Sequence, residues 1–183
     1  MKWLERLFGG PNDMAALPAG SKAPEFSLPA VGGGKDDGGN FSLQAALRRG
    51  PVLAAFFKVS CPTCQYTFPY LERLHQAYGD KKITIVGISQ NDGSDTAAFV
   101  REYGITFRTL LDDPNGYAVS NAYGLTNVPS LFLIGRDGKI EISSVGWVKQ
   151  EVEDINRKLA AAQQITLPPI FKPGEDVRDF RAG

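Results

Sequence analysis

Two cysteines, Cys61 and Cys64, are the only ones in the 183-residue chain, and they form a Cys-X-X-Cys pair. The apolar run 52–57 leads into the pair, and apolar residues then recur every three or four positions, as in a helix. A bridge between two cysteines at this spacing closes too small a loop to staple a fold. A dithiol between a buried strand and a helix instead indicates thiol–disulfide chemistry.

The position of the pair at the start of a helix predicts different roles for the two thiols. A thiolate, not a thiol, attacks a disulfide. At a helix N-terminus, unpaired N–H groups and the helix dipole favour negative charge, and Cys61 is expected there. Cys64, one turn inside, is more shielded. We therefore expect Cys61 to attack a partner disulfide and Cys64 to resolve the mixed disulfide. Pro62 suits the first helical turn because it has no N–H to leave unpaired.

Hydrophobic periodicity predicts the elements that hold the pair in place. Two apolar runs predict buried strands at 52–57 and 83–89, and a shorter strand is expected at 109–111. Two β-rich runs flank an Asp-Gly turn and predict a terminal hairpin at 130–134 and 140–145. Runs on either side of a glycine-rich loop predict a first hairpin at 23–29 and 41–43. Helices are expected at 43–49, 62–78, 95–104, 115–123 and 149–164. Ser42 can cap the first of these, and the stretch from Asp92 to Asp95 can cap the third.

This alternation of strands and helices predicts an α/β fold, in which a mixed sheet is covered by helices on both faces. The chain divides into residues 1–20, an amphipathic helix and linker, residues 21–165, the main domain, and residues 166–183. The last segment is rich in proline, glycine and charge and lacks periodicity, so we interpret it as an extended C-terminal tail.

The composition of the chain argues against several classes of function. Twenty basic residues balance twenty acidic ones, so the sequence lacks the excess of positive charge that is typical of nucleic-acid-binding proteins. The sequence shows no transmembrane run and no recognisable signal peptide, which favours a cytoplasmic protein whose dithiol rests reduced. His75 is the only histidine, and with Cys61 and Cys64 it cannot complete a tetrahedral zinc site. We therefore expect neither a metal nor another cofactor.

Motifs along the chain carry a family resemblance. They are Ala23-Pro24-Glu25-Phe26, the stretch 56–64 with Pro69 in the following helix, Tyr103-Gly104-Ile105, Asn127-Val128-Pro129-Ser130 and Arg136-Asp137-Gly138-Lys139 ahead of Gly146-Trp147. In these motifs, from about residue 23 to about 159, the sequence resembles the thioredoxin superfamily. It is most similar to the TlpA/ResA-like thiol–disulfide oxidoreductases that share a domain with the AhpC/TSA group.

The resemblance implies a thioredoxin-like three-layer fold with an N-terminal β-hairpin extension. It also implies a cis peptide bond between Val128 and Pro129 that faces the dithiol, and a substrate contact surface made by Pro62, Thr63, Val128 and Pro129. The implied partners are a protein or small-molecule disulfide and an electron donor of the thioredoxin-reductase or glutathione type.

Three positions depart from the family pattern. A buried carboxylate six positions before the first cysteine is replaced by Ala55, a glutamate three positions after the second by Thr67, and the aromatic residue before the first by Ser60. The proton acceptor for Cys64 is therefore not identified. Thr67 is a position where a side chain could change the pKa of the dithiol. Lys58 could stabilise a Cys61 thiolate by its charge, although a lysine at a strand end is more often simply solvated.

Two rival functions stay open at this point. A peroxidase of the peroxiredoxin type would carry a proline seven and a threonine three positions before the cysteine, where this chain has Ala54 and Lys58. A redox-inert module could hold peptides in the groove between Cys61 and Pro129, although it would not need both cysteines. If the protein is a thiol–disulfide oxidoreductase, we favour a reductase over an oxidase, because a cytosolic glutathione pool would keep the pair reduced.

Overall fold

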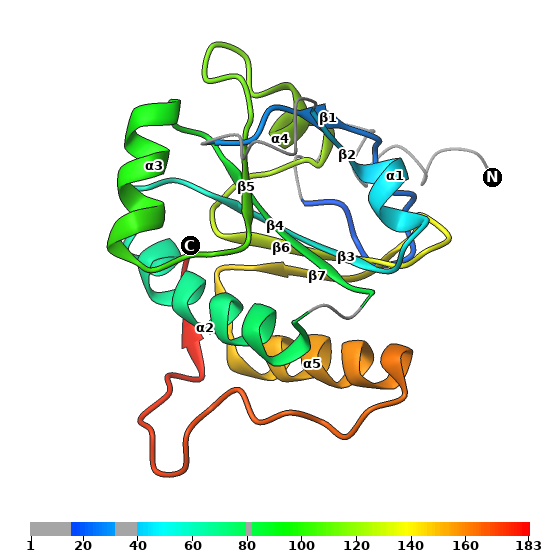
Figure 1. The fold of residues 1–183 in the computed structure, drawn as a ribbon. Coiled ribbons are helices and arrows are strands. Elements are labelled where there is room, and N and C mark those ends of the chain that lie inside the picture. The colour runs from blue at the N-terminus through cyan, green and yellow to red at the C-terminus, as the bar shows by residue number, and fades with distance from the viewer. Residues whose placement is uncertain (1–15, 32–39, 80–81) are drawn as a thin grey trace, which may run out of the picture.

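A computed structural model gives the fold of the chain (Figure 1) and describes residues 16–31, 40–79 and 82–183. The predicted N-terminal helix lies outside the described residues, as does most of the glycine-rich loop of the first hairpin. Among the described residues, no helix is both long and apolar enough to span a membrane.

A five-stranded mixed sheet forms the centre of the domain, in the order β5-β4-β3-β6-β7. The middle strand β3 pairs in parallel with β4 and antiparallel with β6. All six residues of β3 are buried, as expected for a strand covered on both faces. The strands are β3 (Val52–Phe57), β4 (Thr84–Ser89), β5 (Arg108–Leu111), β6 (Ser130–Ile134) and β7 (Ile140–Val145).

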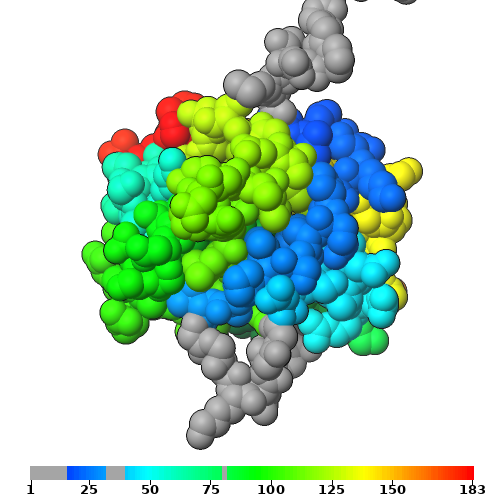
Figure 2. All heavy atoms as spheres, turned by 90° about the horizontal axis from the view of Figure 1, so that it is seen from above, coloured from blue at the N-terminus to red at the C-terminus, as the bar shows by residue number. Residues whose placement is uncertain are grey.

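Helices cover both faces of this sheet, which confirms the predicted three-layer α/β architecture (Figure 1). On one face lie α2 (Pro62–Tyr78), α3 (Gly93–Glu102) and α5 (Lys149–Gln163). On the other lie α1 (Leu43–Leu47), α4 (Ala118–Ala122) and the N-terminal hairpin, formed by β1 (Ser27–Leu28) and β2 (Phe41–Ser42). Figure 2 shows this second face, with the blue N-terminal segment, the cyan α1 and the yellow-green region of α4 side by side.

Alternation along β3 divides the core into two aromatic clusters. Phe57 packs against Phe68 of α2 and Phe99 of α3, with ring centroids 4.3 and 4.9 Å apart. Phe56 points to the opposite face and packs against Tyr123 and Phe132. The end of β3 is therefore fixed from both sides just before the dithiol.

The predicted helix caps at Ser42 and Asp92 are confirmed, since each side chain accepts a hydrogen bond from the amide three residues on. Two predicted elements begin more than two residues too early. The first strand is only two residues long, because Pro24 and Pro29 have no N–H to donate to a ladder. Helix α4 begins only after Tyr117, whose left-handed backbone (φ 48°) separates it from a preceding turn.

Residues 166–183 form no helix, and they pack back on the domain. Ile170 and Val177 are buried in the same core cluster as α2 and α5. Arg73 of α2 donates two hydrogen bonds of 2.8 Å to the Glu175 carboxylate. Beyond this pair, the two-residue strand β9 (Phe180–Arg181) pairs antiparallel with β8 (Trp147–Val148). The tail thereby returns to the start of α2, as the red ribbon of Figure 1 shows.

The Arg73–Glu175 pair predicts a pH-dependent contribution to stability. The two hydrogen bonds from Arg73 lower the pKa of Glu175 from near 4.5 to about 2. The contribution is therefore complete above pH 4.5 and is lost as the pH falls towards 2. We expect Glu175→Gln to unfold at lower denaturant concentration than the wild type at pH 7, and the difference to vanish by about pH 2. Denaturant titrations at pH 7, 4 and 2.5 check this; a difference that does not depend on pH would contradict it.

Candidate functional site

The dithiol lies where β3 gives way to α2. Cys61 is the N-cap residue of α2 with extended backbone, and Pro62 occupies the first helical turn, as predicted. The Cys64 amide donates a hydrogen bond to the Cys61 sulfur at 3.2 Å. One otherwise unpaired N–H of the helix end thus points at the sulfur, where it favours a negative charge.

The two thiols differ in accessibility. Both are free; Cys61 is half-buried, whereas the Cys64 side chain is fully buried. Burial, followed by the hydrogen bond with Cys61, strongly raises the pKa of the Cys64 thiol. Cys64 therefore keeps its proton in the resting protein, and Cys61 is the thiol that a partner can reach.

The loop before β6 brings Val128 against the dithiol. The Val128–Pro129 peptide bond is cis, as the family resemblance implied. The Cys61 thiol is 3.3 Å from the Val128 carbonyl oxygen and can donate to it. The Ser130 hydroxyl donates to the Asn127 carbonyl at 2.7 Å, which holds the turn that presents Val128. The structure thus brings Val128 and Pro129 together with the cysteines from 67 residues away along the chain.

Thr63, between the two cysteines, makes a contact that the sequence did not reveal. Its side chain is 4% exposed, and its hydroxyl donates to the Ala182 carbonyl at 2.6 Å. The tail end therefore belongs to the surroundings of the dithiol. The sequence signal for this is weak, because the segment 178–183 is short, shows no periodicity and lies far from Thr63 along the chain.

Three positions are expected to bear on the pKa of the dithiol: Ala55, Thr67 and Lys58. Ala55 and Thr67 are fully buried, and the Thr67 hydroxyl donates to the Thr63 carbonyl at 2.7 Å within α2. Neither residue supplies the carboxylate that the family pattern has at its position. Lys58 is exposed, with its ammonium 5.8 Å from the centre of the Tyr117 ring. Its role in stabilising a thiolate stays a prediction.

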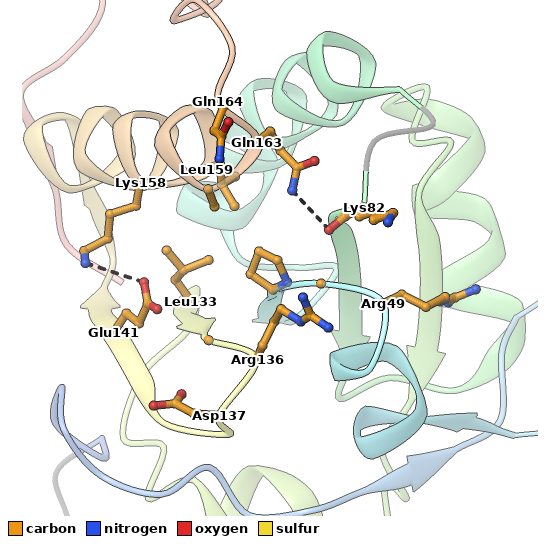
Figure 3. Close-up of a pocket in the computed structure, with 14 residues that line it drawn as sticks. Arg49, Lys82, Leu133, Arg136, Asp137, Glu141, Lys158, Leu159, Gln163 and Gln164 are labelled. Atoms are coloured by element: carbon orange, nitrogen blue, oxygen red, sulfur yellow. Dashed lines mark hydrogen bonds and ion pairs between the residues drawn. The ribbon is translucent and has the colours of Figure 1, made fainter.

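Two surface hollows differ in their relation to the dithiol. A polar hollow of about 240 Å³ borders the loop before β6 and is lined in part by Lys58, Gln90, Asn127 and Val128. A larger hollow of about 500 Å³ (Figure 3) lies at the other end of β3, beside Pro51. There Lys158 pairs with Glu141, and Gln163 donates to the Lys82 carbonyl. Of these two hollows, the one at Val128 lies nearer the dithiol, since the Val128 carbonyl is in contact with Cys61. In the part of the chain that the structure describes, no cluster of three or more potential metal ligands occurs.

Proteins of known family that are similar to this chain agree with this geometry. A model of the AhpC/TSA family matches residues 19–143. The chain belongs to the AhpC/TSA family. It is 28% identical over 144 residues to the thiol-disulfide oxidoreductase ResA of Halalkalibacterium halodurans, covering 78% of this chain and 77% of that protein.

Solved structures place this family member in the thioredoxin fold. A putative thiol:disulfide interchange protein DsbE from Chlorobium tepidum matches with a TM-score of 0.68 and 27% identity, over 81% of this chain and 99% of that one. A putative protein disulfide isomerase from Bacteroides thetaiotaomicron matches with a TM-score of 0.71 and 22% identity, over 81% and 91%. The chain is thus a TlpA/ResA-like member of the thioredoxin superfamily and a thioredoxin-like oxidoreductase.

The unequal burial of the thiols predicts unequal alkylation. We expect iodoacetamide to modify Cys61 in the reduced native protein roughly 100-fold faster than Cys64, because only an accessible thiolate reacts. Peptide mass spectrometry after timed quenching measures both rates. The same labelling in guanidinium chloride is the control and should make the two rates similar. Equal rates in the native protein would contradict the assignment.

Proposed function

We propose that the protein catalyses thiol–disulfide exchange, with Cys61 as the nucleophile and Cys64 as the resolving thiol. The Cys61 thiolate attacks one sulfur of a partner disulfide, forms a mixed disulfide and expels the other partner sulfur as a thiolate. Cys64, once deprotonated, attacks the Cys61 sulfur, forms the Cys61–Cys64 disulfide and releases the second partner thiol. The partner gains two electrons and two protons, and the protein dithiol loses them.

The observation that carries this proposal is the asymmetry of the pair. The Cys61 sulfur is partly accessible and receives the Cys64 amide hydrogen bond, whereas the Cys64 sulfur is enclosed. The names of the relatives, thiol-disulfide oxidoreductase and thiol:disulfide interchange protein, support the same chemistry.

The direction we propose is reduction of the partner. In the reducing compartment predicted from the sequence, a glutathione pool or a thioredoxin-reductase-type donor would return the Cys61–Cys64 disulfide to the dithiol. Protein disulfides are the proposed substrate class, with small-molecule disulfides as a second class.

Single-cysteine variants test the proposed roles. Cys61→Ser and Cys64→Ser should each lower insulin-disulfide reduction with dithiothreitol as donor by at least about 100-fold, because each removes one of two obligatory sulfurs. Only Cys64→Ser should accumulate a mixed disulfide with insulin, since Cys61 can still attack. Non-reducing gels and intact-mass measurement detect this adduct. An adduct on the Cys61→Ser variant, in place of the Cys64→Ser variant, would reverse the assignment.

The missing carboxylate beside Cys64 gives a second test. Thr67 lies three residues after Cys64, so the two side chains share one side of α2. A glutamate there could accept the Cys64 proton, whose release burial now opposes. We expect Thr67→Glu to accelerate disulfide reduction at pH 7 by about tenfold, as for a modest general base. Stopped-flow traces of wild type, Thr67→Glu and the uncharged control Thr67→Gln measure this. Equal rates for all three across pH would refute the idea.

A peroxidase is the alternative function, and the AhpC/TSA match is the observation that favours it. Against it, the proline and threonine of the peroxiredoxin pocket are replaced by Ala54 and Lys58. Peroxide consumption with dithiothreitol as donor separates the two activities, and a rate near that of free thiols excludes the peroxidase. A redox-inert peptide-binding module would instead show no turnover with insulin.

A further inference from the structure

The last six described residues, 178–183, form a strap across the edge of the dithiol site. In Figure 1 the red end of the chain returns to the start of α2, and in Figure 2 it lies beside teal residues of that region. The Ala182 carbonyl accepts a hydrogen bond from the Thr63 hydroxyl at 2.6 Å, and the Gly183 carbonyl accepts one from the side-chain amide of Asn127 at 3.4 Å. The strap thus bridges the Cys-X-X-Cys turn and the loop before Pro129.

Gly183 packs against the Val128 carbonyl oxygen, which is the hydrogen-bond acceptor beside the Cys61 sulfur. A Cβ added to Gly183 would lie 2.6 Å from the Val128 carbonyl oxygen, so the backbone there is packed directly on this group. The same oxygen is 3.3 Å from the Cys61 sulfur. A partner chain that approached Cys61 over Thr63 and Val128 would therefore meet the strap first.

The strap is held as an added β-strand. Phe180 and Arg181 pair with β8, and the Lys149 amide donates to the Asp179 carbonyl at 2.9 Å. The Trp147 indole N–H donates to the Arg178 carbonyl at 2.6 Å. Strand addition of this kind is a common way for proteins to bind extended peptides. The polar groups of β8 that receive the strap would receive a partner peptide in the same way.

The strap is also suited to detach. Phe180 is 64% exposed, and Ala182 and Gly183 are exposed, so the strap places no apolar side chain in the core. A two-residue strand adds little stability of its own. The preceding segment 165–177 keeps Ile170 and Val177 buried and holds the Arg73–Glu175 pair. Residues 180–183 of the strap can therefore leave while this segment, and the bond from the Trp147 indole to Arg178, stay in place.

We propose that the strap is an intramolecular occupant of the partner-binding edge, which makes the dithiol selective by substrate size. This inference rests on the proposed thiol–disulfide exchange. Cys61 is only half-buried with the strap in place, so a small disulfide can reach its sulfur. A disulfide within a polypeptide reacts only after its chain has displaced the strap from Thr63 and Val128.

Two substitutions in the full chain loosen the strap from opposite sides. Thr63→Val removes the hydroxyl that binds Ala182, and Gly183→Val adds a side chain that collides with the Val128 carbonyl. Leu167→Ser, at a 49% exposed position of segment 165–177, is the matched control in the tail. Each pre-reduced protein is mixed with insulin and, separately, with 5,5′-dithiobis(2-nitrobenzoate), and both rates are followed by stopped flow.

We expect each loosening variant to react about fivefold faster with insulin, the change expected when one hydrogen bond of the closed state is lost. The rate with the small disulfide should change less than twofold for Gly183→Val, and Leu167→Ser should match the wild type with both. Because Thr63 lies between the cysteines, the ratio of the two rates is the measure for Thr63→Val. If the ratio of the insulin rate to the small-disulfide rate is unchanged or lower in both loosening variants, the proposed role of the strap is wrong. A wild type that reduces neither disulfide would instead overturn the proposed function.

Discussion

The hydrogen bond from the Cys64 amide to the Cys61 sulfur is the contact on which the site depends. It exists because β3 ends at Phe57 and α2 begins at Pro62, which leaves Cys61 as the cap of a helix whose first N–H groups have no intrahelical partner. The packing of Phe57 on α2 fixes this junction. A sulfur thereby takes the capping place that a serine or aspartate oxygen usually holds.

The same helix geometry separates the two thiols. One turn of helix carries Cys64 from the surface into the apolar cluster beneath α2, where Ala55 and Thr67 offer no charge. Burial then keeps Cys64 protonated until its proton is taken. The order that we propose for the exchange follows from this burial: the accessible sulfur reacts first, and the enclosed one reacts only with a sulfur that is already held beside it.

The sequence was informative where the determinants are local. The buried strands, the caps at Ser42 and Asp92 and the dithiol at a helix start could all be predicted from period and residue type. The cis bond at Pro129 came only from the family resemblance, since residue type alone does not distinguish a cis from a trans proline. The Thr63–Ala182 bond could not be predicted, because 119 residues separate its partners and only the tertiary packing of segment 165–177 aligns them.

That packing explains why a weakly held strap can still compete with a partner. A segment tethered a few residues from its docking site has an effective concentration in the millimolar range, which a free polypeptide must exceed by affinity. The buried Ile170 and Val177 keep this tether short, while the exposed Phe180 and Ala182 keep the strap's own affinity low. A partner that offers both an extended chain and a disulfide gains β8, Thr63 and Val128 together, whereas a chain without a reactive disulfide gains only backbone contacts. The tail thereby raises the selectivity of the dithiol without adding a group to its chemistry.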